Sequence, residues 1–478
     1  MELEVVIGLE VHLQLLTRTK AFCACSSEFG APPNTHTCPV CLGFPGSLPV
    51  FNKTAFECAI KAALSLNCQI ATMMKFDRKN YYYPDLPKNY QISQYDMPLA
   101  SAGYAEVSQG KKKIRIKRAH IEEDAGKLIH DEKNGVSLVD YNRSGMPLLE
   151  IVSEPDINSP EEAHEYLSCL KSIFEYIEVS NCNMEEGSLR CDANISVRIP
   201  GEPLGNKVEL KNMNSFKAVK EALHYESERQ KNLLQNNEKV AQETRLWDED
   251  AKKTVLMRSK EEAQDYRYFP EPDLVPFKVA HELIDAIRAS IPELPKEKKE
   301  RFIMQYNLPP YDAEVLTKDK HLAGFFEKCA LGYTNPKVVS NWIMSELLMY
   351  INEHNLSITE IALEPGSLVE LLKLIDSNMI SGKIAKEVFN EMLLTRKEPL
   401  SIINEKGLTQ ILDEGYIGTV IEKVLKDHQS VVEDYMNGKK NAFIYLVGQV
   451  MKETKGRANP QKTNELLREY LGKKFKKI

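Results

Sequence analysis

Acidic and imidazole side chains alternate near the start of this sequence. Glu10 and His12 stand two positions apart in a stretch where apolar and polar residues alternate, residues 7–12. Because successive side chains of a strand point to opposite faces, these two share one face and Leu9 and Val11 share the other. Such a pair fits a solvated strand surface as well as a cation-binding site.

Another carboxylate lies where a charge is costly. Glu150 falls within the apolar run PLLEIV (147–152), where an ionised carboxylate needs a cation or a hydrogen-bond donor. Upstream, the string HIEEDAGK (120–127) contains Glu122 and Glu123. Oxygen ligands with one imidazole suit Mg²⁺ or Mn²⁺ better than a soft metal. These residues indicate a divalent-metal site for phosphoryl chemistry, and a buried structural ion pair at Glu150 is the alternative.

Two further stretches carry groups that suit phosphate. MEEGSLRCDAN (184–194) combines a glycine turn with Arg190 and Asp192, and KVELKNMNS (207–215) adds Lys211. The sequence has neither a Walker-type Gly-x-x-x-x-Gly-Lys-Ser nor a Gly-x-Gly-x-x-Gly. Bound ATP would therefore lie outside the standard P-loop and Rossmann frames. An ordinary polar strand and turn would look much the same.

Four of the ten cysteines form two close pairs, Cys23 with Cys25 and Cys38 with Cys41. Two such pairs separated by a short loop can close a tetrahedral thiolate site for Zn²⁺, although the first pair has one intervening residue instead of the usual two. Four sulfur ligands leave no position open for substrate, so the expected role is structural. Four unligated cysteines in a loop are the alternative.

The elements that must position these residues change type along the chain. Roughly the first 290 residues read as β-rich, with strands expected at 4–13, 113–118, 189–198 and 207–210 and helices at 53–66 and 160–177. Beyond residue 280 the pattern is helical, at 281–290, 298–306, 341–352 and 367–375, with proline breaks between. We predict an α+β fold with three parts: a mixed, β-rich catalytic domain with the cysteine loop (1–290), an all-α helical domain (291–400) and a small helical tail (401–478).

Composition limits the class of protein. A net charge of −7 argues against a protein that coats nucleic acid, but residues 439–478 hold eleven Lys and Arg against three Glu, enough for a local phosphate-binding surface. A solvated helix face is the alternative. The apolar runs are too short to cross a bilayer, and the first residues lack the features of a signal peptide. We expect a cytoplasmic protein with no membrane contact.

Many longer strings follow one family's order. The chain resembles the B subunits of the three-subunit aspartyl/glutamyl-tRNA(Asn/Gln) amidotransferases over essentially its whole length. The strings that carry the resemblance are VIGLEVHLQL, FDRKNYYYPDLPKNYQISQYD, HIEEDAGK, LVDYNRSGMPLLEIVSEPD, MEEGSLRCDANIS, ELKNMNSF, DYRYFPEPDL and NGKKNAFIYLVGQVMKETKGRANP.

The resemblance implies an activity and partners. Members work in a heterotrimer with an amidase, the A subunit, which releases ammonia from glutamine, and a small C subunit. The B subunit transfers the γ-phosphoryl group of ATP to the side-chain carboxylate of Glu-tRNA(Gln) and/or Asp-tRNA(Asn), and ammonia then displaces phosphate. The chain would thus be part of an ATP-dependent ligase that forms a carbon–nitrogen bond with glutamine as amido donor, and its catalytic domain would form the family's cradle. The acyl phosphate is labile in water, so a closed site and a protected ammonia channel are expected.

The resemblance also implies residue roles. His12, Glu123 and Glu150 would hold Mg²⁺, with Glu10 and Glu122 nearby. Arg190, Asp192 and Lys211 would serve phosphate or metal. Lys79, Tyr82, Lys88 and Tyr90 look like channel or acceptor-end groups, with a packed tyrosine cluster as the alternative. The cysteines match the zinc-bearing subset of the family. The tail resembles the family's tRNA-binding domain, where the following residues would meet phosphate: Lys439, Lys440, Lys452, Lys455 and Arg457.

Two other interpretations remain open from the sequence. A non-catalytic tRNA-binding scaffold would bind tRNA without turning over ATP. The archaeal-type relatives restricted to glutamyl-tRNA carry an inserted middle domain, for which 478 residues leave no room. The three-subunit type is therefore preferred, with Glu-tRNA, Asp-tRNA or both as substrates.

Overall fold

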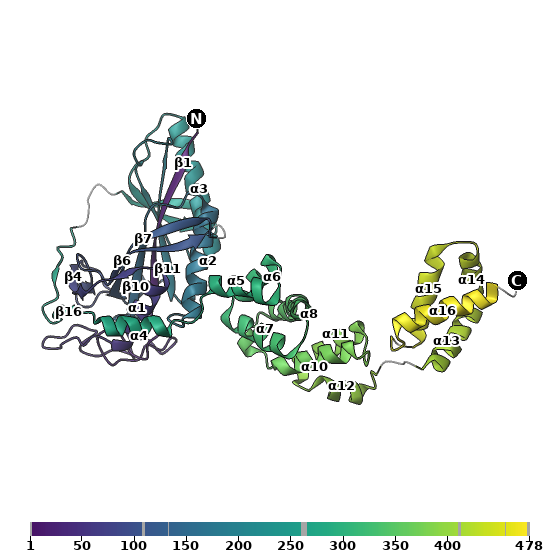
Figure 1. Cartoon of the computed structure of the whole chain (residues 1–478). Helices are drawn as coiled ribbons and strands as arrows, with labels where there is room; N and C mark the ends of the chain where they lie inside the picture. Colours follow the sequence, from purple (N-terminus) through teal and green to yellow (C-terminus); the bar gives the residue numbers. More distant parts are fainter. Residues whose placement is uncertain are drawn as a thin grey trace. The chain divides into compact units, whose positions relative to one another are not determined.

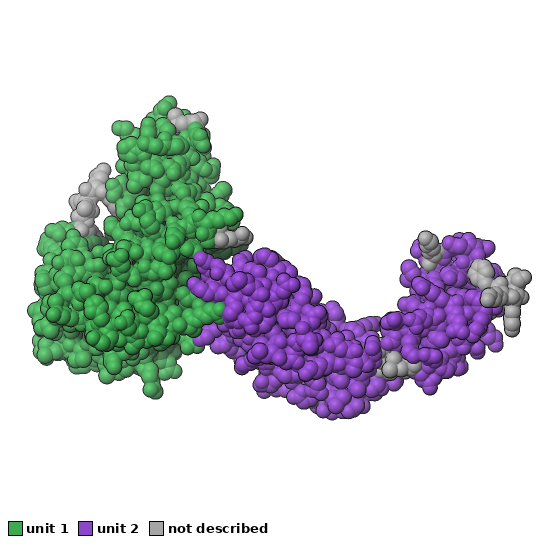
Figure 2. Space-filling model, in the orientation of Figure 1, with its two compact units in different colours: residues 1–295 green, residues 296–478 purple. Residues whose placement is uncertain are grey.

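The computed structural model describes residues 2–107, 110–131, 133–259, 265–409, 413–454 and 456–475. The chain forms two compact units, residues 1–295 and 296–478 (Figure 2). The first contains a large sheet with helices and the second is helical, which confirms the predicted α+β class.

A nine-stranded sheet organises the first unit, with β1 at its centre (Figure 1). Adjacent strands of this sheet pair antiparallel, except β12 and β13, which run parallel to each other. The strands β1, β7 and β11 cover the segments predicted as strands at 4–13, 113–118 and 189–198, and β12 lies one residue later than the segment predicted at 207–210. In sheet order the strands are β14 (Lys253–Ser259), β13 (Glu243–Asp248), β12 (Val208–Lys211), β11 (Leu189–Arg198), β1 (Glu4–Gln14), β10 (Pro147–Ser153), β7 (Lys112–Glu123), β6 (Ala100–Val107) and β2 (Gln69–Ile70).

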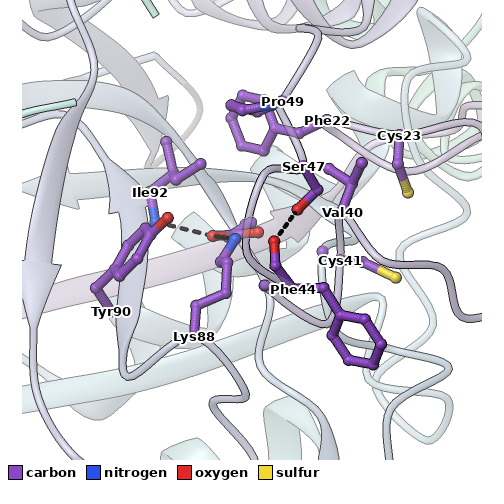
Figure 3. A pocket seen from close by; sticks show the side chains of 13 residues that line it. Phe22, Cys23, Val40, Cys41, Phe44, Ser47, Pro49, Lys88, Tyr90 and Ile92 are labelled. Atoms are coloured by element: carbon purple, nitrogen blue, oxygen red, sulfur yellow. Dashed lines mark hydrogen bonds and ion pairs between the residues drawn. The ribbon is translucent and has the colours of Figure 1, made fainter. Parts of the chain in front are cut away.

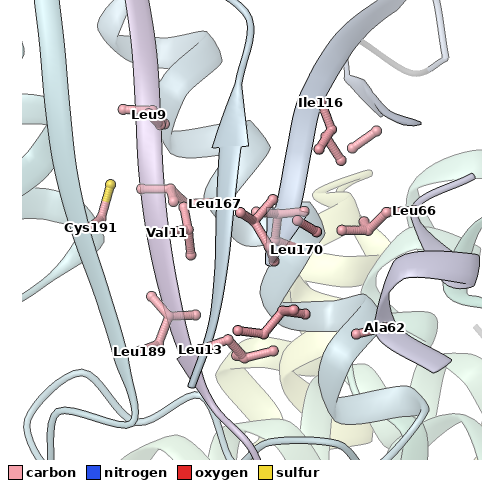
Figure 4. Close-up of a cluster of buried hydrophobic side chains, with 14 of the residues drawn as sticks. Leu9, Val11, Leu13, Ala62, Leu66, Ile116, Leu167, Leu170, Leu189 and Cys191 are labelled. Atoms are coloured by element: carbon pink, nitrogen blue, oxygen red, sulfur yellow. The ribbon is translucent and has the colours of Figure 1, made fainter. Parts of the chain in front are cut away.

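One face of this sheet packs on helices α1 (Lys53–Ser65), α2 (Pro160–Tyr176) and α3 (Phe216–Gln235). The odd-numbered residues of β1 enter this core, and Figure 4 shows Leu9, Val11 and Leu13 among leucines of α2. Helix α2 begins as its sequence predicts, because the Ser159 side chain accepts a hydrogen bond from the Glu162 amide and a proline follows. The helices thus fix which face of β1 carries the polar residues.

Smaller sheets complete the first unit. The hydrogen bond from the Ile121 amide of β7 to Gln94, just after β5, holds β5 against the end of β7. The remaining elements are the sheet β15 (Phe269–Pro270), β4 (Asp77–Asn80) and β5 (Tyr90–Ser93), the pair β16 (Phe277–Lys278) and β3 (Met73–Met74), the pair β8 (Lys127–Asp131) and β9 (Val136–Asp140), and helix α4 (His281–Ser290).

The second unit contains two separate buried clusters, one formed by residues between 302 and 403 and the other by residues between 417 and 471. Every helix in the described part of the chain is too short or too polar to cross a bilayer. The elements of the first cluster are α5 (Pro295–Tyr306), α6 (Pro310–Thr317), α7 (Lys320–Gly332), α8 (Pro336–Trp342), the π-helical turn Ile343–Leu347, α9 (Leu348–His354), the 3₁₀ turn Ile358–Glu360, α10 (Pro365–Asp376), α11 (Gly382–Thr395) and α12 (Pro399–Lys406). Those of the second are α13 (Glu414–Asp427), α14 (Gln429–Met436), α15 (Lys440–Glu453) and α16 (Pro460–Phe475).

Candidate functional site

A row of ionisable side chains crosses the face of the sheet opposite helices α2 and α3. His12 of β1 pairs with Arg190 of β11 on one side and with Glu150 of β10 on the other, and Glu150 pairs with His120 of β7. Residues in register on neighbouring strands lie about 5 Å apart, so their side chains stand next to one another. Four strands distant in sequence therefore build one polar row.

An acidic pair and an imidazole meet in this row. His12 Nε2 lies 3.5 Å from Glu122 Oε1 and 3.5 Å from Glu150 Oε2. The potential ligand atoms of His12, Glu122 and Glu150 all lie within 4.8 Å of one another. We call these three residues the acidic group. Two carboxylate oxygens and one imidazole nitrogen at this spacing match what a hard divalent ion such as Mg²⁺ or Mn²⁺ accepts.

The structure places Glu122, and not the predicted Glu123, in the acidic group. The two are consecutive on β7, so their side chains leave opposite faces of the strand. Glu123 is buried against Lys88, with which it forms an ion pair, and it accepts a hydrogen bond from the Ile92 amide at 2.9 Å. Glu123 therefore belongs to another site, on the far side of β7.

A second row lies beside the first. Glu10 of β1 pairs with Asp192 of β11 and accepts a hydrogen bond from Asn194 Nδ2 at 2.9 Å. Lys211 of β12 contacts Asp192 and lies 3.2 Å from Glu209 Oε1. Burial, and after it the negative charge of Glu150, raises the pKa of Glu10. The predicted candidates Glu10, Asp192 and Lys211 thus share one face with the acidic group.

The charges within the acidic group are mutually dependent. Burial alone would lower the pKa of His12, but the hydrogen bond and charge of Glu150, with Glu122 behind it, raise it. Burial opposes ionisation of Glu150, yet His120 and His12 together hold the pKa of Glu150 well below its usual range. Glu150 is consequently ionised at neutral pH.

The distribution of ion pairs shows where a cation fits. Nearby carboxylates already have a basic partner: Asp124 has Arg190 at 2.9 Å, and Asp192 has Lys211. Among the described residues, no Lys or Arg nitrogen lies within ion-pair distance of Glu122 or Glu150, which contact imidazoles only. Buried carboxylates need compensating charge, so the acidic group suits a hard cation.

The sequence reasoning did not find two residues beside the acidic group. His120 Nε2 lies 3.2 Å from Glu150 Oε2, and Arg118 Nε and Nη2 lie 3.3 and 3.2 Å from His120 Nδ1. Because a guanidinium only donates, His120 Nδ1 accepts and Nε2 carries the hydrogen that Glu150 receives. Arg118 and His120 thus orient Glu150. The signal was available, since both lie an even number of residues before Glu122 on one strand.

The four residues predicted to serve as channel or acceptor-end groups lie in three different places: Lys79 in one, Tyr82 in a second, and Lys88 with Tyr90 in a third. Lys79 is half-buried, with Nζ 4.8 Å from the centre of the Tyr266 ring. Burial alone would lower the pKa of Lys79, but the charges of Glu122 and Glu150 and the neighbouring tyrosines raise it. Tyr82 is 84% exposed and points into solvent.

Lys88 and Tyr90 line a small cavity of about 60 Å³, which lies between β5 and the cysteine loop (Figure 3). The Lys88–Glu123 ion pair forms one wall. Phe22, Val40 and Phe44 contribute apolar groups to the lining. The cavity therefore encloses a paired charge within partly apolar surroundings.

The four predicted cysteines come together. The sulfurs of Cys23, Cys25, Cys38 and Cys41 all lie within 4.8 Å of one another, and all four are free thiols. A hydrogen bond from Cys23, aided by the backbone of Cys38 and the charge of Lys20, lowers the pKa of Cys41 to about 5 against the effect of burial. Four sulfurs, one of them readily ionised, fit a tetrahedral Zn²⁺ site.

Of the five basic residues predicted to meet tRNA, the structure describes the side chains of Lys439, Lys452 and Arg457. Lys439 is exposed and pairs with Asp434 at 2.9 Å, and Lys452 is exposed near the end of α15. Lys440 begins α15. Arg457 is half-buried and donates to the Thr409 carbonyl at 3.2 Å. Lys455 lies outside the described residues.

Comparison with known proteins matches two long segments of the chain to related family models. Residues 5–285 match the family model described as GatB/GatE catalytic domain, and residues 324–471 match the one described as GatB domain. The chain is 60% identical, over 99% of its length and 100% of the relative's, to a protein of Caldanaerobacter subterraneus subsp. tengcongensis that is named as the B subunit of an aspartyl/glutamyl-tRNA(Asn/Gln) amidotransferase. It is 57% identical, over 99% of both chains, to the protein of that name from Carboxydothermus hydrogenoformans.

Proposed function

The chain belongs to the family of aspartyl/glutamyl-tRNA(Asn/Gln) amidotransferase B subunits, and from that premise we propose that it activates misacylated tRNA with ATP. The γ-phosphoryl group passes to the side-chain carboxylate of Glu-tRNA(Gln) and/or Asp-tRNA(Asn). Ammonia then attacks the acyl carbon, the bond to phosphate breaks, and Gln-tRNA(Gln) and/or Asn-tRNA(Asn) is released. The enzyme is a ligase that uses glutamine as amido donor.

One observation carries this proposal: among the described residues, the two carboxylates of the acidic group contact imidazoles only and have no Lys or Arg within ion-pair distance, whereas the nearby Asp124 and Asp192 each pair with a basic side chain. His12, Glu122 and Glu150 would hold Mg²⁺. Bound Mg²⁺ would neutralise negative charge as two anionic reactants approach. Arg190 and Lys79, both beside the acidic group, are the basic groups placed to bind phosphate oxygens.

The Lys88–Glu123 cavity supports a separate role in handling ammonia. The ion pair is buried, and Phe22, Val40, Phe44 and Ile92 give part of the cavity an apolar lining. A small neutral molecule can pass such a lining more readily than an ion can. We assign the arrival of ammonia from the amidase to this side of β7, opposite the acidic group.

The remaining features fit the same assignment. The four cysteines would bind a structural Zn²⁺ that holds a loop with few core residues. The basic tail would contact tRNA phosphates without reading bases. The partners are the amidase, which is the A subunit, and the small C subunit. Because the proposed substrate is tRNA, we expect the enzyme to be cytoplasmic.

The test replaces Glu150 with Ala in the three-subunit enzyme. We expect tRNA-dependent ATP hydrolysis to be lost while glutamine hydrolysis by the amidase persists, because only the acidic group is disturbed. Glu228→Ala on α3 removes an exposed carboxylate and serves as the control. Normal ATP turnover in Glu150→Ala, with tRNA still bound, would instead favour the non-catalytic scaffold.

A further inference from the structure

A lysine is completely buried beside the cysteine cluster. Lys20 has 0% exposure, and its Nζ lies 3.8 Å from Cys41 Sγ and 3.2 Å from the Tyr141 carbonyl oxygen. Within the described residues no carboxylate comes within ion-pair distance of Lys20, in contrast to Lys88, which pairs with Glu123. Lys20 is thus a fully buried basic side chain that has no acidic partner among the described residues.

A buried ammonium group requires compensation. Burial of a cation without a counter-charge is strongly unfavourable, and a carbonyl oxygen offers a dipole but no charge. Cys41 is the remaining polar neighbour. Of the two groups that Lys20 Nζ contacts, only the Cys41 sulfur can carry a counter-charge, so a thiolate at Cys41 would balance Lys20.

The charge of a metal–thiolate centre matches this requirement. Four thiolates around one divalent ion carry a net charge of −2, and such centres are stabilised by donors to their sulfurs. We propose that Lys20 is the charge partner of this centre and positions it within the fold. This proposal rests on the metal site proposed for the four cysteines.

Lys20 also connects the centre to the catalytic side of the domain. Its second contact is the turn that precedes β10, where the Ala21 amide donates to the Gly145 carbonyl at 2.8 Å. Gly145 has φ +82°, and a β-carbon there would lie 3.5 Å from Cys41 Cβ and 3.8 Å from Glu123 Oε2. Lys20 therefore ties the cysteine loop to the turn that leads into the strand of Glu150.

The first experiment measures zinc retention by the full-length chain. Lys20→Met keeps an unbranched side chain, one atom shorter, and removes its charge. The control is Lys61→Met, because Lys61 donates to the Ile177 carbonyl at 2.9 Å and has no hydrogen bond to the four clustered cysteines. With Zn²⁺ as the probe and a chromogenic chelator as competitor, we expect Lys20→Met to bind zinc about 10- to 100-fold more weakly than the wild type and the control. Retention within twofold of the control overturns the proposal.

The second experiment separates charge pairing from simple support of the Tyr141 turn. In a variant with all four cysteines replaced by Ala, Lys20 keeps Tyr141 but loses its counter-charge, so adding Lys20→Met should raise the melting temperature. In the zinc-loaded parent the same change should lower it. A shift in the same direction in both backgrounds refutes charge pairing. If Lys20→Met in the zinc-binding parent does not yield folded protein, the comparison of the cysteine-free variant with and without Lys20→Met tests charge pairing by itself.

The outcomes distinguish this inference from the metal assignment beneath it. If the wild type binds no zinc, the proposed metal site itself fails. If the wild type binds one equivalent of zinc and Lys20→Met binds it equally well, only the role of Lys20 fails.

Discussion

Neutralising Glu122 and Glu123 one at a time gives opposite expected results, although the two residues are adjacent. Glu122 faces His12 and Glu150, whereas Glu123 faces Lys88. Glutamine has nearly the same shape as glutamate, so each substitution removes a charge with little change in packing. We expect Glu122→Gln to weaken divalent-ion binding and Glu123→Gln to weaken the fold.

The expected magnitudes follow from burial and distance. Lys88 and Glu123 are only 7% and 4% exposed, so loss of the Glu123 charge strands a buried ammonium, at a cost of about 3–5 kcal/mol. In the ion-free protein, Glu122 and Glu150 repel each other. Their ligand atoms lie within 4.8 Å of each other, so this Coulomb repulsion is roughly 3 kcal/mol at an effective dielectric constant of about 20. Glu122→Gln relieves this repulsion and gives up the contact with His12, so its net effect on stability without metal should be small or favourable.

Two measurements on the same proteins check this prediction. Binding of Mn²⁺, followed by electron paramagnetic resonance, should weaken at least tenfold in Glu122→Gln, since even the loss of a supporting partner has about that effect. In Glu123→Gln the melting temperature without metal should fall by roughly 6–20 °C, at 2–4 °C per kcal/mol for a domain of this size. The reverse pattern, with ion binding lost only in Glu123→Gln, would refute the placement of Glu122 and restore the assignment made from the sequence.

Three further predictions concern other parts of the chain. His120→Leu removes the donor 3.2 Å from Glu150 and should weaken Mn²⁺ binding about tenfold, measured in the same titration; unchanged binding would remove His120 from any positioning role. Ending the chain after Thr409 removes α13–α16 and should raise the KM for tRNA at least about tenfold while ammonia-supported turnover at saturating tRNA persists, and equal KM values would contradict the tail assignment. Burial alone would raise the pKa of Asp312, but Lys337 and Ser340 lower it, so Asp312 stabilises the fold above its unfolded pKa of about 4 and this contribution declines as pH falls from there through the lower folded pKa. Asp312→Asn should therefore melt at a lower temperature than the wild type at pH 7, and the gap should narrow steadily as pH falls below about 4; a gap that stays constant or widens with falling pH would contradict this assignment.

Much of the sheet followed from period-two patterns in the sequence. The alternation at 4–13 placed Glu10 and His12 on one face, and the structure has them there, opposite the buried Leu9 and Val11. The apolar run around Glu150 predicted a buried charge with a special partner, and Glu150 indeed lies between two imidazoles. These features depend on local sequence alone, which is why they were predictable.

The choice between Glu122 and Glu123 depended on long-range register. Both are acidic and adjacent, so the pattern HIEED allows either one to face His12. The structure decides through the pairing of β7 with β10, which sets Glu150 opposite His120 and has a register shift at Val152 and Ser153. A shift of one residue exchanges the two faces of a strand, and no local signal reports it. Lys20 was missed for the same reason, since its partner Cys41 is distant in sequence.

Three consecutive residues, the last two of β7 and the one that follows it, serve three separate groups of side chains. Glu122 points to the acidic group, Glu123 to Lys88, and Asp124 to Arg190. The Asp124 amide donates to the Met146 carbonyl at 2.8 Å, and its own carbonyl accepts from the Gly145 amide at 2.9 Å. These two bonds lock the end of β7 to the start of β10, so the spacing of Glu122 and Glu150 is set by backbone pairing rather than by flexible loops. Groups that must meet a reacting centre within a few tenths of an ångström need such rigid support. The same backbone segment therefore holds the proposed metal ligands, the wall of the cavity proposed for ammonia and a candidate phosphate-binding arginine in fixed relation.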